Sequence, residues 1–355
     1  MPRSQWLIPL GDVTPQDREL AGTKMARLGE LLRMGVPVPQ GFVITSVAFK
    51  RFLERRNLSQ EIRKTLGRIK PTIEQTGKLD PALANLREFL ESAEMPAELG
   101  AIIHQGYDDL CNALGVRGTP VVVRSSATSE DAAEASLAGQ FETYLGVSKD
   151  DLETFVKKCW ASLFTSRAVT YLVKKDLPLE RALMAVGVQE LVDAKSAGVV
   201  FTIDPVTGNS SKIVIEGSWG LGESVVQGKV TPDRYTLDKH SLAIESTLIS
   251  NKTTGLFYDP AKKQIAEVAV PKEAASKPCL SQEEVIELGR LAKQIEEHYG
   301  GAPQDIEWVL EKETTNPGKF RIVQCRPETV WSAKKSGGFD VVDYMIDSLF
   351  RRKDK

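Results

Sequence analysis

The chain has 355 residues, of which 41% are hydrophobic and 26% charged, and its formal net charge is −2. This length suits two or three domains, and 48 acidic against 46 basic residues argue against nucleic acid or an anionic membrane as a partner. No apolar run approaches the roughly 20 residues that span a bilayer, and the first apolar stretch is too short for a secretory signal. Four cysteines lie far apart, with neither metal-site nor disulfide-rich spacing, so we expect a cytoplasmic protein: Cys111, Cys159, Cys279 and Cys325.

Helix-like and strand-like segments alternate along the chain. Apolar residues at three- and four-residue steps predict a mostly helical segment from about 49 to 111 and a second helical stretch over roughly 149–174. A capping box of Ser281 and Glu284 predicts a helix that runs toward Tyr299. Short strands are expected at 121–123, 184–192, 197–203, 212–217 and 235–237, and a hairpin at 305–311 and 319–326. We therefore expect an α/β (α+β) chain with mixed sheets in at least two subdomains.

The end of the sequence is predicted to hold a glycine-containing linker and a short amphipathic helix. Its apolar stripe consists of Val341, Tyr344, Met345, Leu349 and Phe350. Such a stripe either docks a partner or packs against its own domain.

A glycine turn at Gly22-Thr23 presents Lys24 at the start of a helix. A lysine at that place, together with the free amides of the helix, can bind an anionic ligand. The alternative is a solvated lysine on a capping turn.

A strand at 121–123 leads into Arg124 and a loop rich in serine and threonine, including Thr128 and Ser129. The planar guanidinium of Arg124 suits phosphate oxygens, and small hydroxylated residues let the backbone approach a polyphosphate. The alternative is an ordinary surface loop. The glycine-rich stretch at 216–223 fits neither the dinucleotide nor the Walker A pattern, and a packing bend is the favoured reading there.

The hairpin gives the most specific prediction. If Glu307 lies opposite Gln324, the turn centres near Thr315-Asn316, which fits the Asn-Pro-Gly signal. Alternation then places Asp305, Glu307, Gln324 and Arg326 on one face. Two carboxylates and an amide oxygen match what Mg²⁺ prefers when it is also held by nucleotide phosphates, and the arginine adds a phosphate clamp. The alternative is an exposed face with a surface ion pair.

The three histidines stand in sequence contexts without metal-ligand or nucleophile patterns. We expect His104, His240 and His298 to be surface or capping residues. If the protein moves phosphate, its own histidines are not the predicted acceptor.

Together these motifs resemble the nucleotide-binding part of the phosphoenolpyruvate synthase and pyruvate phosphate dikinase family, which includes rifampicin phosphotransferase. The similarity covers about residues 20 to 330. The matching stretches, in family order, are GTKMARLGELL (22–32), VPVPQGFVIT (36–45), VRSSATSED (123–131), WASLFTSRA (160–168), GVVFTIDPVTG (198–208), GLGE with VTPD (220–233), and DIEW with QCRPET (305–329).

The resemblance implies an ATP-grasp fold that holds ATP between two subdomains with mixed or antiparallel sheets and flanking helices. It implies an N-terminal subdomain over 1–190 with a helical insert at about 50–112, a C-terminal subdomain over 191–330 that carries the hairpin, and a linker with tail helix over 331–355. Lys24 and Arg124 would contact phosphates, and Gln189 and the Leu191 backbone would lie beside adenine. Glu307 and Gln324, with Asp305 beside them, would bind Mg²⁺ or Mn²⁺, and Arg326 would steady the transferring group. Lys24, Arg124 and Arg326 are thus the expected catalytic residues.

Enzymes of this family pass phosphate through a histidine on a separate swivelling domain, and no histidine of this sequence matches that motif. The sequence therefore looks most like the separate ATP-binding subunit of phenylphosphate synthase in anaerobic phenol degradation, whose histidine carrier is another subunit. The expected reaction is an AMP-forming, dikinase-type phosphotransfer through a partner's histidine to phenol. The alternatives are an ATP-binding part of a pyruvate- or rifampicin-phosphorylating enzyme, or a non-catalytic nucleotide sensor.

Overall fold

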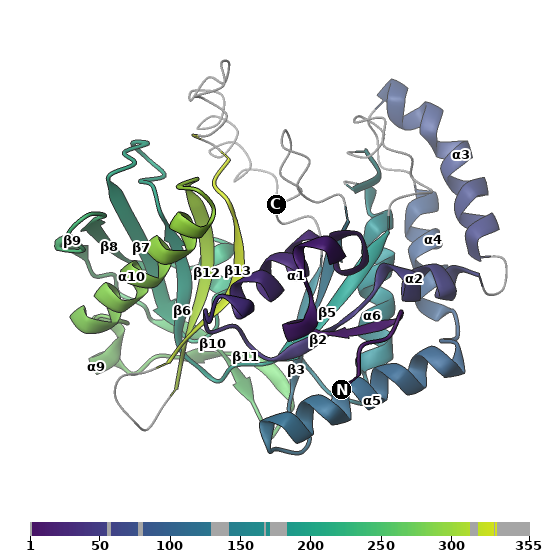
Figure 1. Cartoon of the computed structure of the whole chain (residues 1–355), viewed down its shortest axis with the longest axis horizontal. Coiled ribbons are helices and arrows are strands. Elements are labelled where there is room, and N and C mark those ends of the chain that lie inside the picture. Colours follow the sequence, from purple (N-terminus) through teal and green to yellow (C-terminus); the bar gives the residue numbers. More distant parts are fainter. Residues whose placement is uncertain are drawn as a thin grey trace.

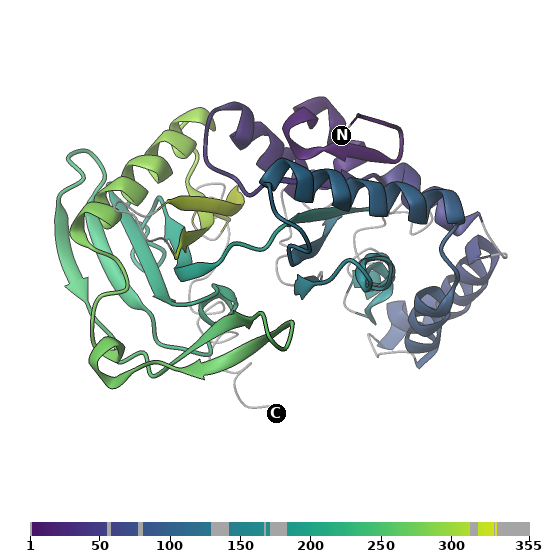
Figure 2. The same ribbon diagram turned by 90° about the horizontal axis from the view of Figure 1, so that it is seen from below.

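The computed structural model describes residues 2–54, 58–76, 81–128, 142–166, 168–170, 183–312, 319–329 and 331. Figure 1 shows two β-sheets side by side, with helix α1 (Arg18–Arg33) passing between them in the view. Figure 2, turned by 90°, shows the same two lobes. The expected tail helix and the tip of the expected hairpin lie outside the described residues.

The first sheet has the strand order β1-β2-β5-β3-β4, and all its neighbours are antiparallel. Its strands are β1 (Leu7–Pro9), β2 (Gly41–Ile44), β3 (Val121–Ala127), β4 (Thr143–Val147) and β5 (Met184–Glu190). The central strands β3 and β5 are rich in valine and almost entirely buried, as expected for strands covered on both faces.

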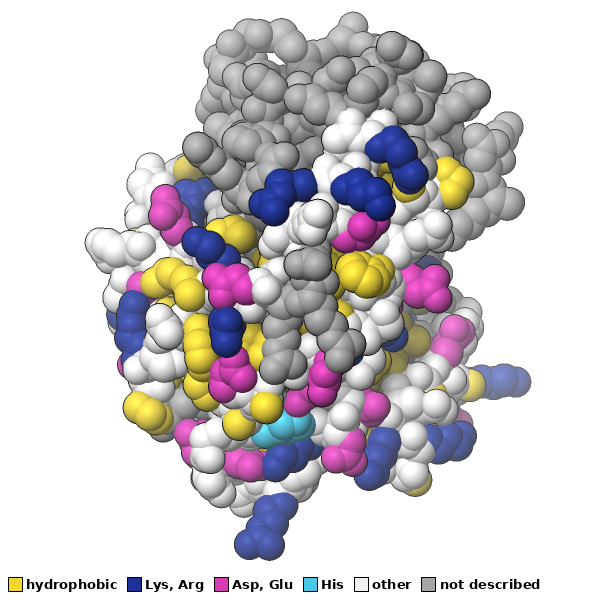
Figure 3. Space-filling model, turned by 90° about the vertical axis from the view of Figure 1, so that its right-hand side faces the viewer, with side chains coloured by type: hydrophobic (Ala, Val, Ile, Leu, Met, Phe, Trp, Pro, Cys, Tyr) yellow, Lys and Arg dark blue, Asp and Glu magenta, His cyan; other side chains and the backbone are white. Residues whose placement is uncertain are grey.

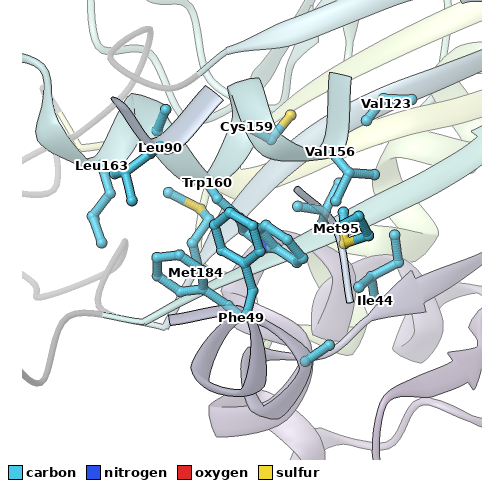
Figure 4. Close-up of a cluster of buried hydrophobic side chains, with 14 of the residues drawn as sticks. Ile44, Phe49, Leu90, Met95, Val123, Val156, Cys159, Trp160, Leu163 and Met184 are labelled. Atoms are coloured by element: carbon cyan, nitrogen blue, oxygen red, sulfur yellow. The ribbon is translucent and has the colours of Figure 1, made fainter. Parts of the chain in front are cut away.

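Helices cover this sheet, and four of them lie in the segment predicted as mostly helical at about 49 to 111. The helices are α2 (Ser46–Leu53), α3 (Leu58–Thr76), α4 (Pro81–Ser92), α5 (Ala97–Leu114) and α6 (Leu152–Ala161). The core under them is aromatic: the ring of Trp160 lies 5.4 Å from that of Phe49 and 5.0 Å from that of Phe52 (Figure 4). The predicted helical stretch over 149–174 is interrupted: α6 ends at Ala161, a 3₁₀ turn (Ser162–Phe164) follows, and the chain is helical again at 166 and 168–170, while residues 171–182 lie outside the described part.

The second sheet has the order β13-β12-β6-β7-β8-β9, again antiparallel. Its strands are β6 (Ala194–Phe201), β7 (Lys212–Trp219), β8 (Asp233–Asp238), β9 (Ile244–Leu248), β12 (Gln304–Glu311) and β13 (Phe320–Pro327). Helix α10 (Gln282–His298) covers one face of the sheet (Figure 1), and the predicted Ser281–Glu284 capping box is present at its start.

A two-stranded ribbon, β10 (Thr254–Asp259) and β11 (Gln264–Ala269), joins the two lobes and was not predicted. It is fixed to the second sheet where the amide of Leu221 donates to the Leu256 carbonyl at 2.8 Å. The ring of Tyr258 packs on Gly146 of β4, where a Cβ would lie 3.1 Å from it. Two short helices, α8 (Glu223–Val226) and α9 (Lys272–Ala275), flank the ribbon.

The chain is thus a mixed α/β protein with antiparallel sheets and flanking helices, as the sequence predicts. The strands of the first sheet all precede residue 191 and those of the second all follow residue 193, and we propose the boundary between the two subdomains at 190/191. Among the described helices none is long and apolar enough to cross a membrane. All four cysteines are buried free thiols, and acidic and basic side chains are interspersed on the face seen in Figure 3.

Candidate functional site

The predicted hairpin face is present. Glu307 of β12 lies opposite Gln324 of β13, and Asp305 lies opposite Arg326. The amide Nε2 of Gln324 donates to Oε1 of Glu307 at 2.9 Å, and Arg326 binds Oδ2 of Asp305 through Nε at 2.8 Å and Nη2 at 2.7 Å. The expectation of one polar face is confirmed.

The opposite face of the hairpin packs into the core. Ile306, Trp308 and Leu310 are completely buried, in a cluster that includes apolar residues of α10. Their burial fixes the register, because a slip by one residue would turn the carboxylates into this core. Hydrophobic packing therefore holds the polar face toward the other lobe.

A β-bulge beside Glu307 was not foreseen. Glu307 pairs with Gln324 but the next residue, Trp308, pairs with Ile322, so Val323 has no cross-strand partner in the register. Its carbonyl oxygen instead accepts a hydrogen bond from Nη1 of Arg124. Bulges commonly re-aim groups beside functional sites, and this one supplies an acceptor for an arginine of the other sheet.

Arg124 reaches the hairpin from β3. It is buried, at 5% exposure, and its Nη2 donates to Oε1 of Gln324 at 2.8 Å. The predicted phosphate-binding arginine and the predicted metal ligand are therefore in direct contact.

Lys24 joins the same group through a break in α1. The backbone of Gly22 has φ 70° and ψ 164°, so the chain kinks and a new helical segment starts at Thr23. The hydroxyl of Ser126 accepts a hydrogen bond from the amide of Met25 at 3.2 Å, and Nζ of Lys24 donates to the Ser125 carbonyl at 3.3 Å. The glycine turn and the serine loop, read as separate motifs, form one structural unit.

The electrostatics of this set favour a bound cation and phosphates. Burial raises the pKa of Glu307 above its ordinary value, while Arg124 and Lys24 act in the opposite direction. An ionised Glu307 is thus incompletely compensated, and a divalent cation would stabilise it.

No cluster of three or more histidine, cysteine or acidic side chains suited to a metal occurs among the described residues. Two carboxylates and an amide oxygen nevertheless fit Mg²⁺, which takes its remaining ligands from phosphates and water.

Of the residues expected near adenine, Gln189 belongs to β5 of the first sheet and Leu191 to the segment that connects the two sheets. Gln189 is buried, and its Nε2 donates to the Pro39 carbonyl at 3.1 Å. The amide of Leu191 donates to the Pro120 carbonyl at 3.0 Å, so a base could meet the backbone of this residue only at its carbonyl oxygen. Beside them is an apolar cluster that draws on both lobes: Val192, Ala194, Ala197, Leu221 and Val309, with Leu145, Leu191, Leu256, Ile265 and Val323 packed against them.

Other residues singled out in the sequence contact partners outside the Arg124–Gln324–Glu307 group. Thr128 donates to the Leu183 carbonyl at 3.3 Å through its hydroxyl, and Ser129 lies outside the described residues. The glycine-rich stretch bends at Gly220, which follows β7 with φ 80° and where a Cβ would lie 2.2 Å from the Leu256 carbonyl oxygen, as expected for a packing bend. His104 contacts Glu153 at 3.0 Å and His298 contacts Glu30 at 2.8 Å, consistent with structural rather than catalytic histidines.

Comparison with known proteins identifies the family of this chain. A family model described as "Pyruvate phosphate dikinase, AMP/ATP-binding domain" matches residues 18–341. A probable phosphoenolpyruvate synthase of Staphylothermus marinus is 42% identical over 93% of this chain and 42% of its own length. The phosphoenolpyruvate synthase of Aeropyrum pernix is 41% identical over 92% of this chain and 42% of its own length.

The chain spans less than half the length of these curated relatives, at 42% of each. The family match itself covers nearly the whole chain and includes every residue placed at the site above. This protein belongs to the family of pyruvate phosphate dikinase AMP/ATP-binding domains.

Proposed function

We propose that this chain is the Mg-ATP-binding part of an AMP-forming phosphotransferase, and that it transfers a pyrophosphoryl group to a histidine on a partner subunit. The observation that carries the proposal is the chain of contacts from Arg124 to Gln324 at 2.8 Å and from Gln324 to Glu307 at 2.9 Å. It brings a phosphate-binding cation and a metal-binding carboxylate together at the junction of two sheets.

The roles of the side chains follow from their chemistry. Lys24 and Arg124 neutralise phosphate charge from the side of the first sheet, and Arg326 does so from the hairpin. Glu307 and Gln324, with Asp305 beside them, hold the metal, which when bound screens the phosphates and fixes their orientation. The apolar cluster between the lobes receives the base.

The transfer needs a nucleophile from outside the site. A neutral imidazole nitrogen attacks the β-phosphorus, a nitrogen–phosphorus bond forms, and the bond from that phosphorus to the α-phosphate oxygen breaks, which releases AMP. Water then cleaves orthophosphate from the pyrophosphorylated histidine and leaves phosphohistidine. His104 and His298 are paired with Glu153 and Glu30, which supports a partner's histidine as the acceptor.

Two final acceptors are proposed on different grounds. The resemblance to a split phenylphosphate synthase favours phenol. The relatives named phosphoenolpyruvate synthases favour pyruvate. In both cases the acceptor binds elsewhere, and the reaction on this chain is the same.

The test mixes the chain with Mg-ATP, a purified histidine-carrier subunit and either phenol or pyruvate, and follows AMP. AMP that forms only with the carrier, together with phenylphosphate or phosphoenolpyruvate, supports the proposal and identifies the acceptor. A carrier whose histidine is replaced by alanine is the control and yields no AMP. Tight ATP binding without AMP in any mixture favours the nucleotide sensor instead.

A further inference from the structure

A row of half-exposed side chains crosses the face of the second sheet that α10 leaves uncovered. Glu307 is opposite Val199, Val199 is opposite Glu216, and Glu216 is opposite Arg234. Residues directly opposite each other in an antiparallel sheet share a face. Glu216 therefore points to the same side of the sheet as Glu307, from two strands away, a distance of about 10 Å.

This row is one accessible part of the middle strands, where Phe201 of β6 and Lys212 of β7 are also partly exposed. On β7, the residues two positions before and after Glu216 face the same way, yet Val214 and Ser218 are 0% and 1% exposed. On β6, Ala197 is also completely buried, whereas Val199 is partly exposed. An exposed strip thus leads from the proposed phosphate site to Glu216.

Two groups of residues indicate where the base and the phosphates of a bound nucleotide would lie. The apolar cluster with Val309 and Leu191 is the place for the base, and Glu307 with Gln324 and Arg124 is the place for the phosphates. The sugar links the two and lies over the strands between them, beside Val199. Glu216 is the polar side chain next to Val199 along this row.

The charges around Glu216 favour an uncharged hydrogen-bond donor. Its carboxylate is 3.7 Å from Nη1 of Arg234, and Nη2 of the same arginine is 3.3 Å from Asp204. One guanidinium faces two carboxylates, so this cluster repels phosphate. Burial raises the pKa of Glu216 while Arg234 acts in the opposite direction, so the ionised carboxylate is only partly compensated and has capacity to accept hydrogen bonds. Hydroxyl groups fill that capacity without adding negative charge.

We infer that Glu216 accepts hydrogen bonds from the 2′- and 3′-hydroxyl groups of the nucleotide ribose, with Arg234 as the positioning residue that holds its carboxylate. Carboxylates recognise ribose in this way in other nucleotide sites. The inference rests on the proposed function, because it assumes that ATP binds between the two sheets. It makes Glu216 the residue that distinguishes ribonucleotides from deoxyribonucleotides.

The experiment uses the full chain and calorimetric titration with Mg-ATP, 2′-deoxy-ATP and 3′-deoxy-ATP. We expect the wild type to lose about tenfold or more in affinity when a bonded hydroxyl is removed, as for a hydrogen bond to a charged group. Glu216→Gln should reduce this ratio to about threefold or less, mainly by weakening ATP binding. Glu216→Asp keeps the charge on a shorter side chain, and it should also lose discrimination between ATP and the deoxynucleotides.

The matched control is Glu245→Gln on β9, an exposed carboxylate paired with Lys212. It should leave the affinity ratio at the wild-type value, and thermal unfolding checks that each variant is folded. Equal affinity of the wild type for all three nucleotides overturns the inference, as does full discrimination by Glu216→Gln. Absence of any ATP binding by the wild type is a different result, since it contradicts the proposed function itself.

Discussion

Nη2 of Arg124 on β3 donates a hydrogen bond of 2.8 Å to Oε1 of Gln324 on β13, across 200 positions of sequence. The same guanidinium binds the carbonyl of Val323. One buried side chain of the first sheet is thereby fixed to two consecutive residues of the second. The proposed phosphate and metal sites are coupled through this contact.

Replacement of Arg124 by lysine should disable the site while preserving its charge. Lysine has one ammonium group and cannot supply a planar fork to Gln324, Val323 and a phosphate. We expect Arg124→Lys to weaken ATP binding by about tenfold or more in calorimetry. Arg321→Lys is the control, because Arg321 pairs with Glu311 at 2.6 Å on the same hairpin, and it should retain wild-type affinity. An equal loss of ATP affinity in both variants would contradict a specific role for Arg124.

Glu307→Gln should stabilise the ligand-free protein and impair nucleotide binding. The pKa of Glu307 is raised by burial, so its stabilising contribution is complete below its unfolded pKa and is lost as the pH rises through the folded value. Burial disfavours the ionised carboxylate, and the uncharged amide should therefore raise Tm by about 2 °C. Magnesium-dependent ATP affinity should fall by more than about tenfold. A lower Tm with unchanged affinity would remove Glu307 from the metal site.

Gly22 should tolerate no side chain. A Cβ there would lie 2.1 Å from the Ser126 carbonyl oxygen, on a backbone with φ 70° and ψ 164°. We expect Gly22→Ala to lower the free energy of unfolding by about 3 kcal/mol or more. Gly35→Ala also has positive φ, at 79°, but meets no atom within 4 Å, and should lose only about 1 kcal/mol. Urea unfolding of both variants measures the difference, and similar losses would contradict the close approach.

Asp17 should make stability depend on acid pH. Its hydrogen bonds with Arg3, and then those from Thr14, lower its pKa from 3.8 to about 2. A lowered carboxyl pKa contributes stability above the unfolded value and loses it as the pH falls through the folded value. Arg3 is partly exposed, so we expect Asp17→Asn to lose only about 1–2 kcal/mol at pH 7. This difference should shrink between pH 4 and pH 2 in urea unfolding, and a constant difference would exclude the ionised pair as its source.

Much of the hairpin could be predicted because a short antiparallel pair obeys local rules. The pairing of Glu307 with Gln324, the starting assumption of the sequence-based prediction, is present, and alternation assigns Trp308 to the core. The bulge at Val323 escaped prediction, since nothing in the local sequence separates a regular pair from one with an extra residue.

The contacts that assemble the site could not be predicted from residues alone. The meeting of Arg124 with Gln324 and that of Lys24 with Ser125 depend on how two sheets and a kinked helix pack. Ser126, which caps the segment after the kink, was visible in the serine-rich loop, but its partner Met25 was not. The ribbon β10–β11 was missed because its strands, partly exposed in β10 and mostly exposed in β11, lack a regular apolar alternation.

The central claim is that Glu307 and Gln324 hold the metal of ATP bound between the two sheets. A crystal of the chain with a non-hydrolysable ATP analogue and Mn²⁺ tests it through the anomalous signal of the metal. The account predicts a manganese peak within about 2.5 Å of the Glu307 carboxylate and the Gln324 amide oxygen, with phosphates against Arg124 and Lys24. A nucleotide whose metal lies away from both residues would contradict it.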